Sequence, residues 1–134
     1  QRETRKDGMM VQKLLWLGAA GALGALARYG LTGAVQHWFG TAFPWGTVVV
    51  NTAGCLVFGV LWAVGAERLL LGPELRTVVL VGFMGAFTTY STYIAETGRL
   101  AAESEWMLAA GNVLLQNTLG LGLFFLGLGI GRWI

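Results

Sequence analysis

The sequence predicts an all-α membrane protein with four transmembrane helices. Hydrophobic residues make up 55% of the 134 residues, charged residues make up only 12%, and the mean hydropathy is +0.63. A soluble domain of this size is less apolar and more charged. Four stretches also reach the roughly 20 mostly apolar residues that a helix needs to cross the hydrocarbon core of a bilayer. Together they occupy nearly the whole chain, so no second domain is expected.

The first expected span covers residues 11–38. It follows basic residues and contains many small ones, as a secretory signal peptide does. Its length, the internal charge of Arg28 and the aromatic residue Trp38 at its end favour a retained transmembrane helix. Residues 1–10 are then an N-terminal tail, which need not belong to the natural sequence. The transmembrane domain comprises residues 11–134.

Charges and turn residues delimit the other three spans. The second, 44–66, starts at Pro44, which suits the first turn of a helix, and contains no charge. The third, 75–98, follows the turn-forming pair Gly72–Pro73. The fourth, 106–132, has no charge before its last residue.

The positive-inside rule gives the chain only a weak orientation. Four spans place both termini and the middle loop on one side of the membrane, and we expect that side to be cytoplasmic. It carries the larger share of basic residues, namely Arg2, Arg5, Lys6, Lys13, Arg68, Arg76 and Arg132. The opposite side has Arg99 and, less clearly, Arg28. Without the tail, the bias is small enough to permit insertion in both directions.

The third span contains an unusual polar stretch, in which hydroxyl-bearing residues run from Thr88 to Tyr93 soon after Gly85. Such residues at membrane depth are costly unless they face protein or water. One interpretation is a helix broken near its middle, whose freed carbonyl groups bind a cation. The other is a continuous helix in which serine and threonine hydroxyls bond to the preceding turn. The pattern alone does not decide between them.

Further polar residues lie inside the expected spans. Thr47 and Asn51 share a face of the second helix, and the fourth contains Asn112, Gln116, Asn117 and Thr118. In the third helix, Tyr90, Tyr93 and Glu96 recur at three-residue steps. One or two such residues would only bridge helices. A whole set with almost no fixed charge favours a pathway for a small anion, whose hydration shell neutral donors can replace.

Three segments carry a specific resemblance: GALGALARYG (21–30), GTVVVNTAGC (46–55) and GFMGAFTTYSTY (82–93). In sequence, order and spacing they resemble the signature stretches of the Fluc or CrcB family of fluoride channels, and the resemblance extends from Met10 to the end of the chain. It implies a passive, fluoride-selective channel of a bacterial inner membrane that relieves fluoride toxicity. It also implies a dual-topology homodimer, with two antiparallel subunits and two pores along their interface.

The resemblance also assigns roles to residues. Backbone carbonyls of Gly85 and Thr88 would hold a structural Na⁺ at the centre of the dimer. The fluoride pathway would include Thr47, Asn51, Tyr90, Ser91, Thr92, Tyr93 and Thr118. Arg28 would lie in the aqueous vestibule, although an arginine there also suits an interfacial anchor. The supporting polar residues would be Glu96, Asn112, Gln116 and Asn117.

The chain departs from the family pattern at a few positions. Tyr90 and Tyr93 stand where many members have phenylalanines, whose positive ring edges face fluoride. The tyrosine ring keeps that edge but adds a hydroxyl that changes width and hydrogen bonding. Leu114 stands where a hydroxyl is expected in the fourth helix, and Asn112 or Gln116 can take its place.

Other functions fit the sequence less well. A small multidrug-resistance exporter is also a four-helix antiparallel dimer, but it needs a carboxylate in its first helix, and residues 11–38 contain none. A structural membrane subunit that binds partners through glycine-rich faces is a second alternative. We do not expect an enzyme, because the sequence has no nucleotide-binding motif and its single histidine is His37. Nothing in the sequence indicates nucleic-acid binding.

Overall fold

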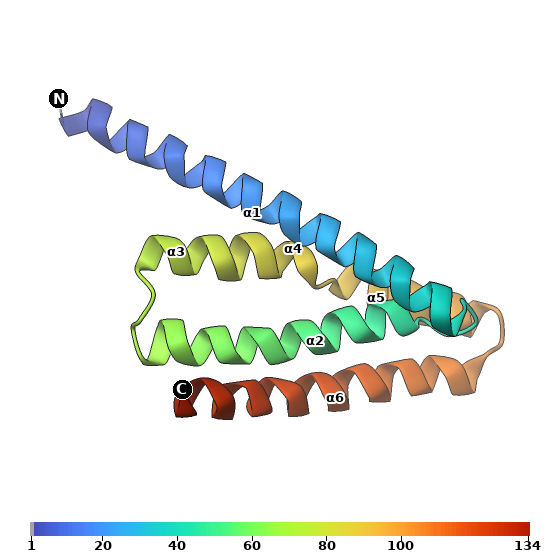
Figure 1. Cartoon of the computed structure of the whole chain (residues 1–134). Coiled ribbons are helices and arrows are strands. Elements are labelled where there is room, and N and C mark those ends of the chain that lie inside the picture. Colours follow the sequence, from blue (N-terminus) through green and yellow to red (C-terminus); the bar gives the residue numbers. More distant parts are fainter. Residues whose placement is uncertain (1) are drawn as a thin grey trace.

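The computed structural model describes residues 2–134, with side chains described from Asp7 onward, and its regular elements over this range are all helical (Figure 1). Four helical segments are long and apolar enough to cross a membrane: Asp7–Phe39, Trp45–Glu67, Pro73–Ala102 and Trp106–Trp133. The predicted all-α architecture with four spans is confirmed.

The first helix, α1 (Arg2–Phe39), is the longest. It begins at Arg2, so most of the predicted N-terminal tail is part of this helix. The helix ends at Phe39, and the next residue, Gly40, has a φ of +76°, a left-handed conformation that glycine adopts without strain. The N–H of Gly40 donates to the carbonyl of Gln36 at 2.8 Å and so bonds one of the last carbonyls of the helix.

The second span consists of α2 (Trp45–Trp62) and the wider π-helical turn η1 (Ala63–Glu67). Pro44 lies immediately before α2 rather than in its first turn. The fourth span is the single helix α6 (Trp106–Trp133).

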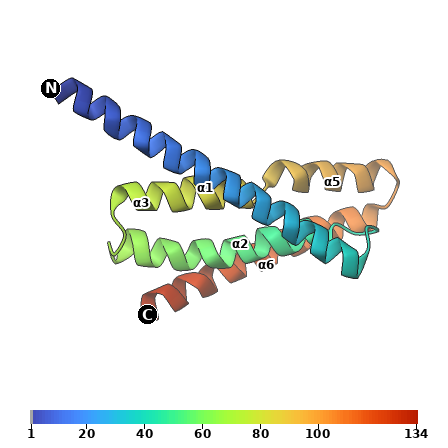
Figure 2. The ribbon, with the colours of Figure 1, turned by 45° about the horizontal axis from the view of Figure 1, so that its top comes forward.

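The third span is divided into four pieces: α3 (Pro73–Thr77), the π-helical η2 (Val78–Met84), the short α4 (Gly85–Phe87) and α5 (Tyr90–Ala102). Between α4 and α5, Thr88 has φ −85° and ψ 157°, and Thr89 has φ −148° and ψ 114°. Both are extended rather than helical conformations. As a result, α5 is displaced from the line of α4 (Figure 2).

The spans alternate in direction, so both termini and the connection between η1 and α3 lie at one end of the molecule (Figure 1). At that end, Arg132 near the end of α6 donates two hydrogen bonds, of 2.7 and 2.8 Å, to the carboxylate of Glu67 in η1. This two-pronged ion pair links the ends of the second and fourth spans.

Glycine permits the closest helix contacts. A Cβ added at Gly59 in α2 would overlap the carbonyl oxygen of Phe124, and one at Gly127 in α6 would overlap that of Leu56. The α1 helix crosses the third span in the same way, because a Cβ at Gly24 would overlap the carbonyl oxygen of Phe83. Small residues therefore set the distances between spans, as they do in many membrane proteins.

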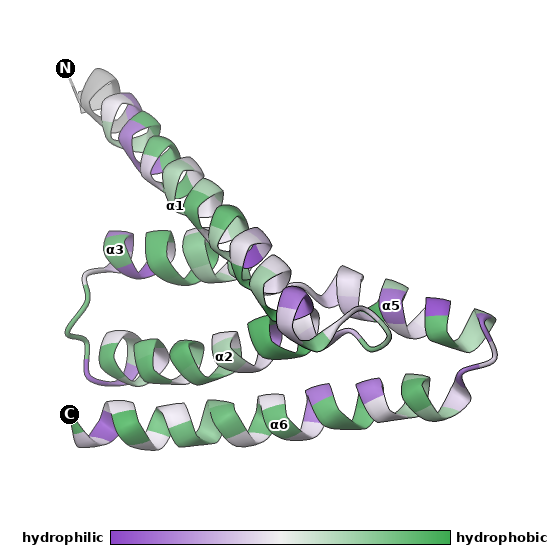
Figure 3. Cartoon of the chain, turned by 45° about the vertical axis from the view of Figure 1, so that its right-hand side comes forward, coloured by the Kyte–Doolittle hydropathy of each residue, from purple (hydrophilic) through white to green (hydrophobic). Residues whose placement is uncertain are grey.

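The spans are unequally buried within one chain. In the most apolar window of the first span only 6% of residues are buried, compared with 39% in the second. Hydropathy is uneven as well: hydrophilic segments occur in α5 and in the half of α6 beside it, while the other half of α6 is mostly apolar (Figure 3). The polar interior is therefore confined to one part of the bundle.

We predict that Gly127→Ala lowers the free energy of unfolding by about 1–3 kcal/mol, because the added methyl group meets backbone atoms that cannot rotate away. The matched control is Gly129→Ala in the same helix, where an added Cβ meets nothing within 4 Å. That variant should stay within about 0.5 kcal/mol of the parent. Unfolding in mixed micelles followed by circular dichroism measures both, and equal stabilities would contradict the close α2–α6 contact.

Candidate functional site

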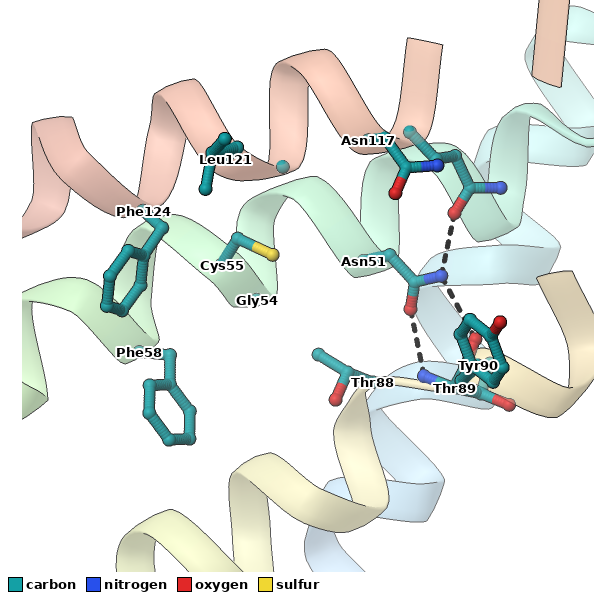
Figure 4. Close-up of a pocket in the computed structure, with 12 residues that line it drawn as sticks. Asn51, Gly54, Cys55, Phe58, Thr88, Thr89, Tyr90, Asn117, Leu121 and Phe124 are labelled. Carbon is teal, nitrogen blue, oxygen red and sulfur yellow. Dashed lines mark hydrogen bonds between the residues drawn. The ribbon is translucent and has the colours of Figure 1, made fainter. Parts of the chain in front are cut away.

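A cavity of about 460 Å³ lies beside the interruption between α4 and α5 (Figure 4). Its polar wall consists of Asn51, Thr88, Thr89, Tyr90, Gln116 and Asn117. Its apolar end consists of Phe58, Leu121 and Phe124, and Gly54, Cys55 and Gly120 complete the lining. The cavity thus passes from amides and hydroxyls to aromatic rings and has no charged residue in its lining.

Asn51 of α2 pairs with the extended backbone at the interruption. Its Oδ1 accepts a 2.8 Å hydrogen bond from the N–H of Thr89, and its Nδ2 donates to the carbonyl of Thr89 at 3.0 Å (Figure 4). These are the two bonds that a neighbouring strand would supply. Because unpaired backbone groups are costly in lipid, the side chain stabilises a conformation that the helix cannot satisfy by itself.

A chain of side-chain hydrogen bonds continues from Asn51 into α6 and α5. Asn51 Nδ2 donates to Gln116 Oε1 at 2.8 Å, and Gln116 Nε2 donates to Asn112 Oδ1 at 2.9 Å. Asn112 Nδ2 then donates to the hydroxyl of Thr97 at 2.8 Å, which donates to the carbonyl of Tyr93 at 2.8 Å. The predicted residues Asn51, Asn112 and Gln116 therefore form one connected network.

This network also fixes which protons remain free. Both N–H groups of the Asn51 amide are engaged, one by Thr89 and one by Gln116. The hydroxyl of Thr88 donates to the carbonyl of Met84 at 3.0 Å. An amide has two donors and a hydroxyl one, so neither side chain has a proton left for a bound anion in this conformation.

The interruption leaves carbonyl groups without helical donors, among them those of Gly85 and Thr88. In a continuous helix the carbonyl of Gly85 would accept from the N–H of Thr89, and that of Thr88 from the N–H of Thr92. Instead, the N–H of Thr89 donates to Asn51, and the N–H of Thr92 donates to Thr89 Oγ1 at 3.3 Å. Both predicted cation-binding carbonyls thus lack their usual helical donors.

A second, smaller cavity of about 240 Å³ brings together Arg28, Thr47 and Glu96. Thr47 donates a 2.8 Å hydrogen bond to Glu96 Oε1, whereas Glu96 Oε2 is buried without a partner among the described side chains. Ala25, Tyr29, Thr32, Val50, Thr89 and Thr92 complete the lining. Thr89 lines both cavities, so the two approach each other at this residue of the interruption.

The remaining predicted residues are placed differently. Tyr93 is 7% exposed and Tyr90 is 75% exposed, with their ring centroids 5.6 Å apart. Asn117 donates a 3.1 Å hydrogen bond to the hydroxyl of Tyr93. Ser91 lies within 3.3 Å of Thr89 Oγ1. Thr118 is exposed and lines neither cavity, so its place in a pathway stays a prediction.

A family model described as CrcB-like protein, Camphor Resistance (CrcB), matches residues 15–128. The chain belongs to this CrcB-like family. The resemblance indicated by the three sequence motifs is thereby confirmed.

Several curated CrcB-like relatives carry the name fluoride-specific ion channel FluC. One from Nitrosococcus oceani is 53% identical over 125 residues, which cover 93% of this chain and 100% of the relative. One from Nitratidesulfovibrio vulgaris strain Miyazaki F is 52% identical over 127 residues, covering 92% of this chain and 100% of the relative. One from Solidesulfovibrio magneticus is 50% identical over 125 residues, covering 93% and 100% respectively.

Sequence reasoning missed some residues of this CrcB-like site. Thr97 connects Asn112 to the backbone of α5, and its position four residues after Tyr93 was the available signal. Phe58 and Phe124 form the apolar end of the larger cavity, with ring centroids 6.5 Å apart. Aromatic residues inside apolar helices give no such signal, because they are common in any packed core.

We predict that Asn51→Leu destabilises the chain by about 1–3 kcal/mol, since it keeps the side-chain size but leaves the N–H of Thr89 without an acceptor. Thr118→Val, which changes an exposed residue in α6, should shift the free energy of unfolding by less than about 0.5 kcal/mol. Equilibrium unfolding in detergent compares the two variants. An Asn51→Leu protein as stable as the parent would show that the pairing with Thr89 does not support the interruption.

Proposed function

We propose that the chain is a fluoride-specific ion channel that lets fluoride leave the cytoplasm passively. The observation that carries this proposal is the cavity beside Thr88 and Thr89, which is lined by amides and hydroxyls without a charged residue. It occurs in a chain whose relatives, at 50–53% identity over nearly its full length, are named fluoride-specific channels.

Neutral hydrogen-bond donors suit conduction of a small anion. They replace part of its hydration shell, yet without a positive charge they do not hold the ion too strongly to leave. Arg28 lines the adjacent smaller cavity, where its charge attracts anions toward the polar wall at Thr89. Fluoride would pass from this vestibule along Thr89 into the larger cavity and on toward Phe58 and Phe124.

Passive flow is sufficient for export. Fluoride enters cells as a neutral weak acid, dissociates at cytoplasmic pH and is trapped as the anion. A membrane potential that is negative inside then drives the anion outward through a selective channel. The protein is therefore a channel and not an enzyme, and its family membership does not favour the multidrug-resistance exporter or the structural subunit. A bacterial inner membrane is the compartment in which such a leak would act.

The working unit in this proposal is an antiparallel homodimer. The weak charge bias of the chain permits insertion in both directions, which such a dimer requires. The first span buries only 6% of its most apolar window within one chain, and Tyr90 at the cavity is 75% exposed. A second copy would cover these surfaces and close the open side of the polar wall, giving two pathways related by symmetry.

A structural Na⁺ fits the freed carbonyls of Gly85 and Thr88. Both oxygens have lost their helical donors to Asn51 and to Thr89 Oγ1. Carbonyl oxygens of unwound helix segments are ligands that Na⁺ accepts in membrane proteins. In the dimer the same two carbonyls of the partner would complete the site and join the two interruptions.

The direct test of the channel is fluoride efflux from liposomes that contain the purified protein. With valinomycin to carry compensating K⁺, a fluoride electrode should record rapid release, and a chloride electrode should record none. In Asn51→Asp the release should fall to the level of empty liposomes. A carboxylate would repel the anion and would place an oxygen against the carbonyl of Thr89 and the Oε1 of Gln116. Undiminished flux in this variant would count against a pathway beside Asn51.

The sodium site has a separate test. Complete exchange of Na⁺ for N-methyl-D-glucamine should lower fluoride efflux or dissociate the dimer, because an organic cation of that size cannot replace Na⁺ between backbone carbonyls. Returning Na⁺ alone should restore efflux. If efflux and the dimer both persist after exhaustive exchange, Gly85 and Thr88 hold no required cation.

A further inference from the structure

The orientation of the Asn117 amide is fixed by its own helix. Asn117 Nδ2 donates to the carbonyl of Val113 at 2.7 Å and also to the hydroxyl of Tyr93 at 3.1 Å. If the amide were turned over, its oxygen would face the carbonyl oxygen of Val113, which is repulsive. The hydroxyl of Tyr93 must therefore be the acceptor in its bond with Asn117.

This assignment leaves the proton of the Tyr93 hydroxyl free. Among the described side chains, from residue 7 to 134, no acceptor is hydrogen-bonded to it. The side chain is 7% exposed, so water does not readily supply one. A buried donor without an acceptor is costly, and an arrangement that keeps one is expected where a ligand provides the missing acceptor. A phenol that already accepts a hydrogen bond is also a stronger donor.

The Tyr93 side chain adjoins the larger cavity but is not part of its lining. Asn117 and Tyr90 both line that cavity, and each contacts Tyr93, one through its amide and the other through its ring. Three donors of the wall are already engaged, because both N–H groups of Asn51 and the hydroxyl of Thr88 bond to protein acceptors. The Tyr93 hydroxyl is therefore a donor close to this cavity that the described part of the protein leaves without an acceptor.

We propose that Asn117 holds the Tyr93 hydroxyl in the orientation that offers its proton to fluoride. Tyr93 is then a fluoride-contacting donor, and Asn117 is a positioning residue that acts through it. Fluoride is the strongest hydrogen-bond acceptor among the halides, so a hydroxyl donor here adds selectivity for it. This inference rests on the proposed channel function. It gives the hydroxyl of Tyr93 a role that a phenylalanine at this position cannot have.

Fluoride efflux measured over a range of fluoride concentrations tests the proposal. Tyr93→Phe removes only the hydroxyl and should raise the half-saturating fluoride concentration about fivefold, the usual effect of one neutral hydrogen bond. Asn117→Ala should raise it by a similar factor, and the double variant should be no worse than Tyr93→Phe. Thr77→Val is the control, because it removes a hydroxyl of the same span that bonds to the carbonyl of Pro73 outside both cavities.

Each outcome has a distinct meaning. If the parent conducts fluoride and Tyr93→Phe has an unchanged half-saturating concentration, the proposed donor is wrong while the channel function stands. Additive effects in the double variant would overturn the positioning role of Asn117. A parent that releases no fluoride would overturn the channel function, and this inference with it.

An optical measurement on the parent protein tests the contact without depending on the folding of a variant. Fluoride that accepts the phenol proton should shift the near-ultraviolet absorption of tyrosine to longer wavelength, whereas chloride should not. The shift should disappear in Tyr93→Phe. No fluoride-induced shift in a conducting parent would contradict the proposal.

Discussion

The arrangement of the chain depends on one requirement, that backbone polar groups at membrane depth have hydrogen-bond partners. A continuous helix meets it internally, but Thr88 and Thr89 are extended, and the N–H of Thr89 has no acceptor in its own helix. The amide oxygen of Asn51 supplies that acceptor, and its Nδ2 donates a further bond to the carbonyl of Thr89. A single side chain of α2 thus allows the third span to open inside the bilayer.

The same pairing determines what the site offers a ligand. By taking the N–H of Thr89, Asn51 releases the carbonyl of Gly85, an oxygen suited to a small cation. By donating to Gln116, it begins the hydrogen-bond chain that reaches Thr97 in α5 and orders the polar wall. The stabilising network and the proposed anion pathway therefore use the same residues, so selectivity depends on which donors the network leaves free.

Local patterns in the sequence predicted the four spans, because a long stretch of mostly apolar residues between charged ones is itself the signal of a transmembrane helix. They also located the polar stretch of the third span, although hydroxyl residues alone left a broken and a continuous helix equally open. The pairing of Asn51 with Thr89 could not be predicted from the sequence, since it joins residues 38 positions apart and depends on how two helices pack. For the same reason the exposed position of Thr118 and the role of Thr97 required the structure.

The reversal potential of the purified protein in a planar bilayer, with a fluoride gradient opposed by an equal gradient of chloride, tests the central claim most directly. The account predicts a reversal potential equal to the fluoride equilibrium potential, because neutral donors arranged around Thr89 conduct fluoride and exclude chloride. A reversal potential at the chloride equilibrium value, or near zero, would contradict a fluoride-selective pathway at this site.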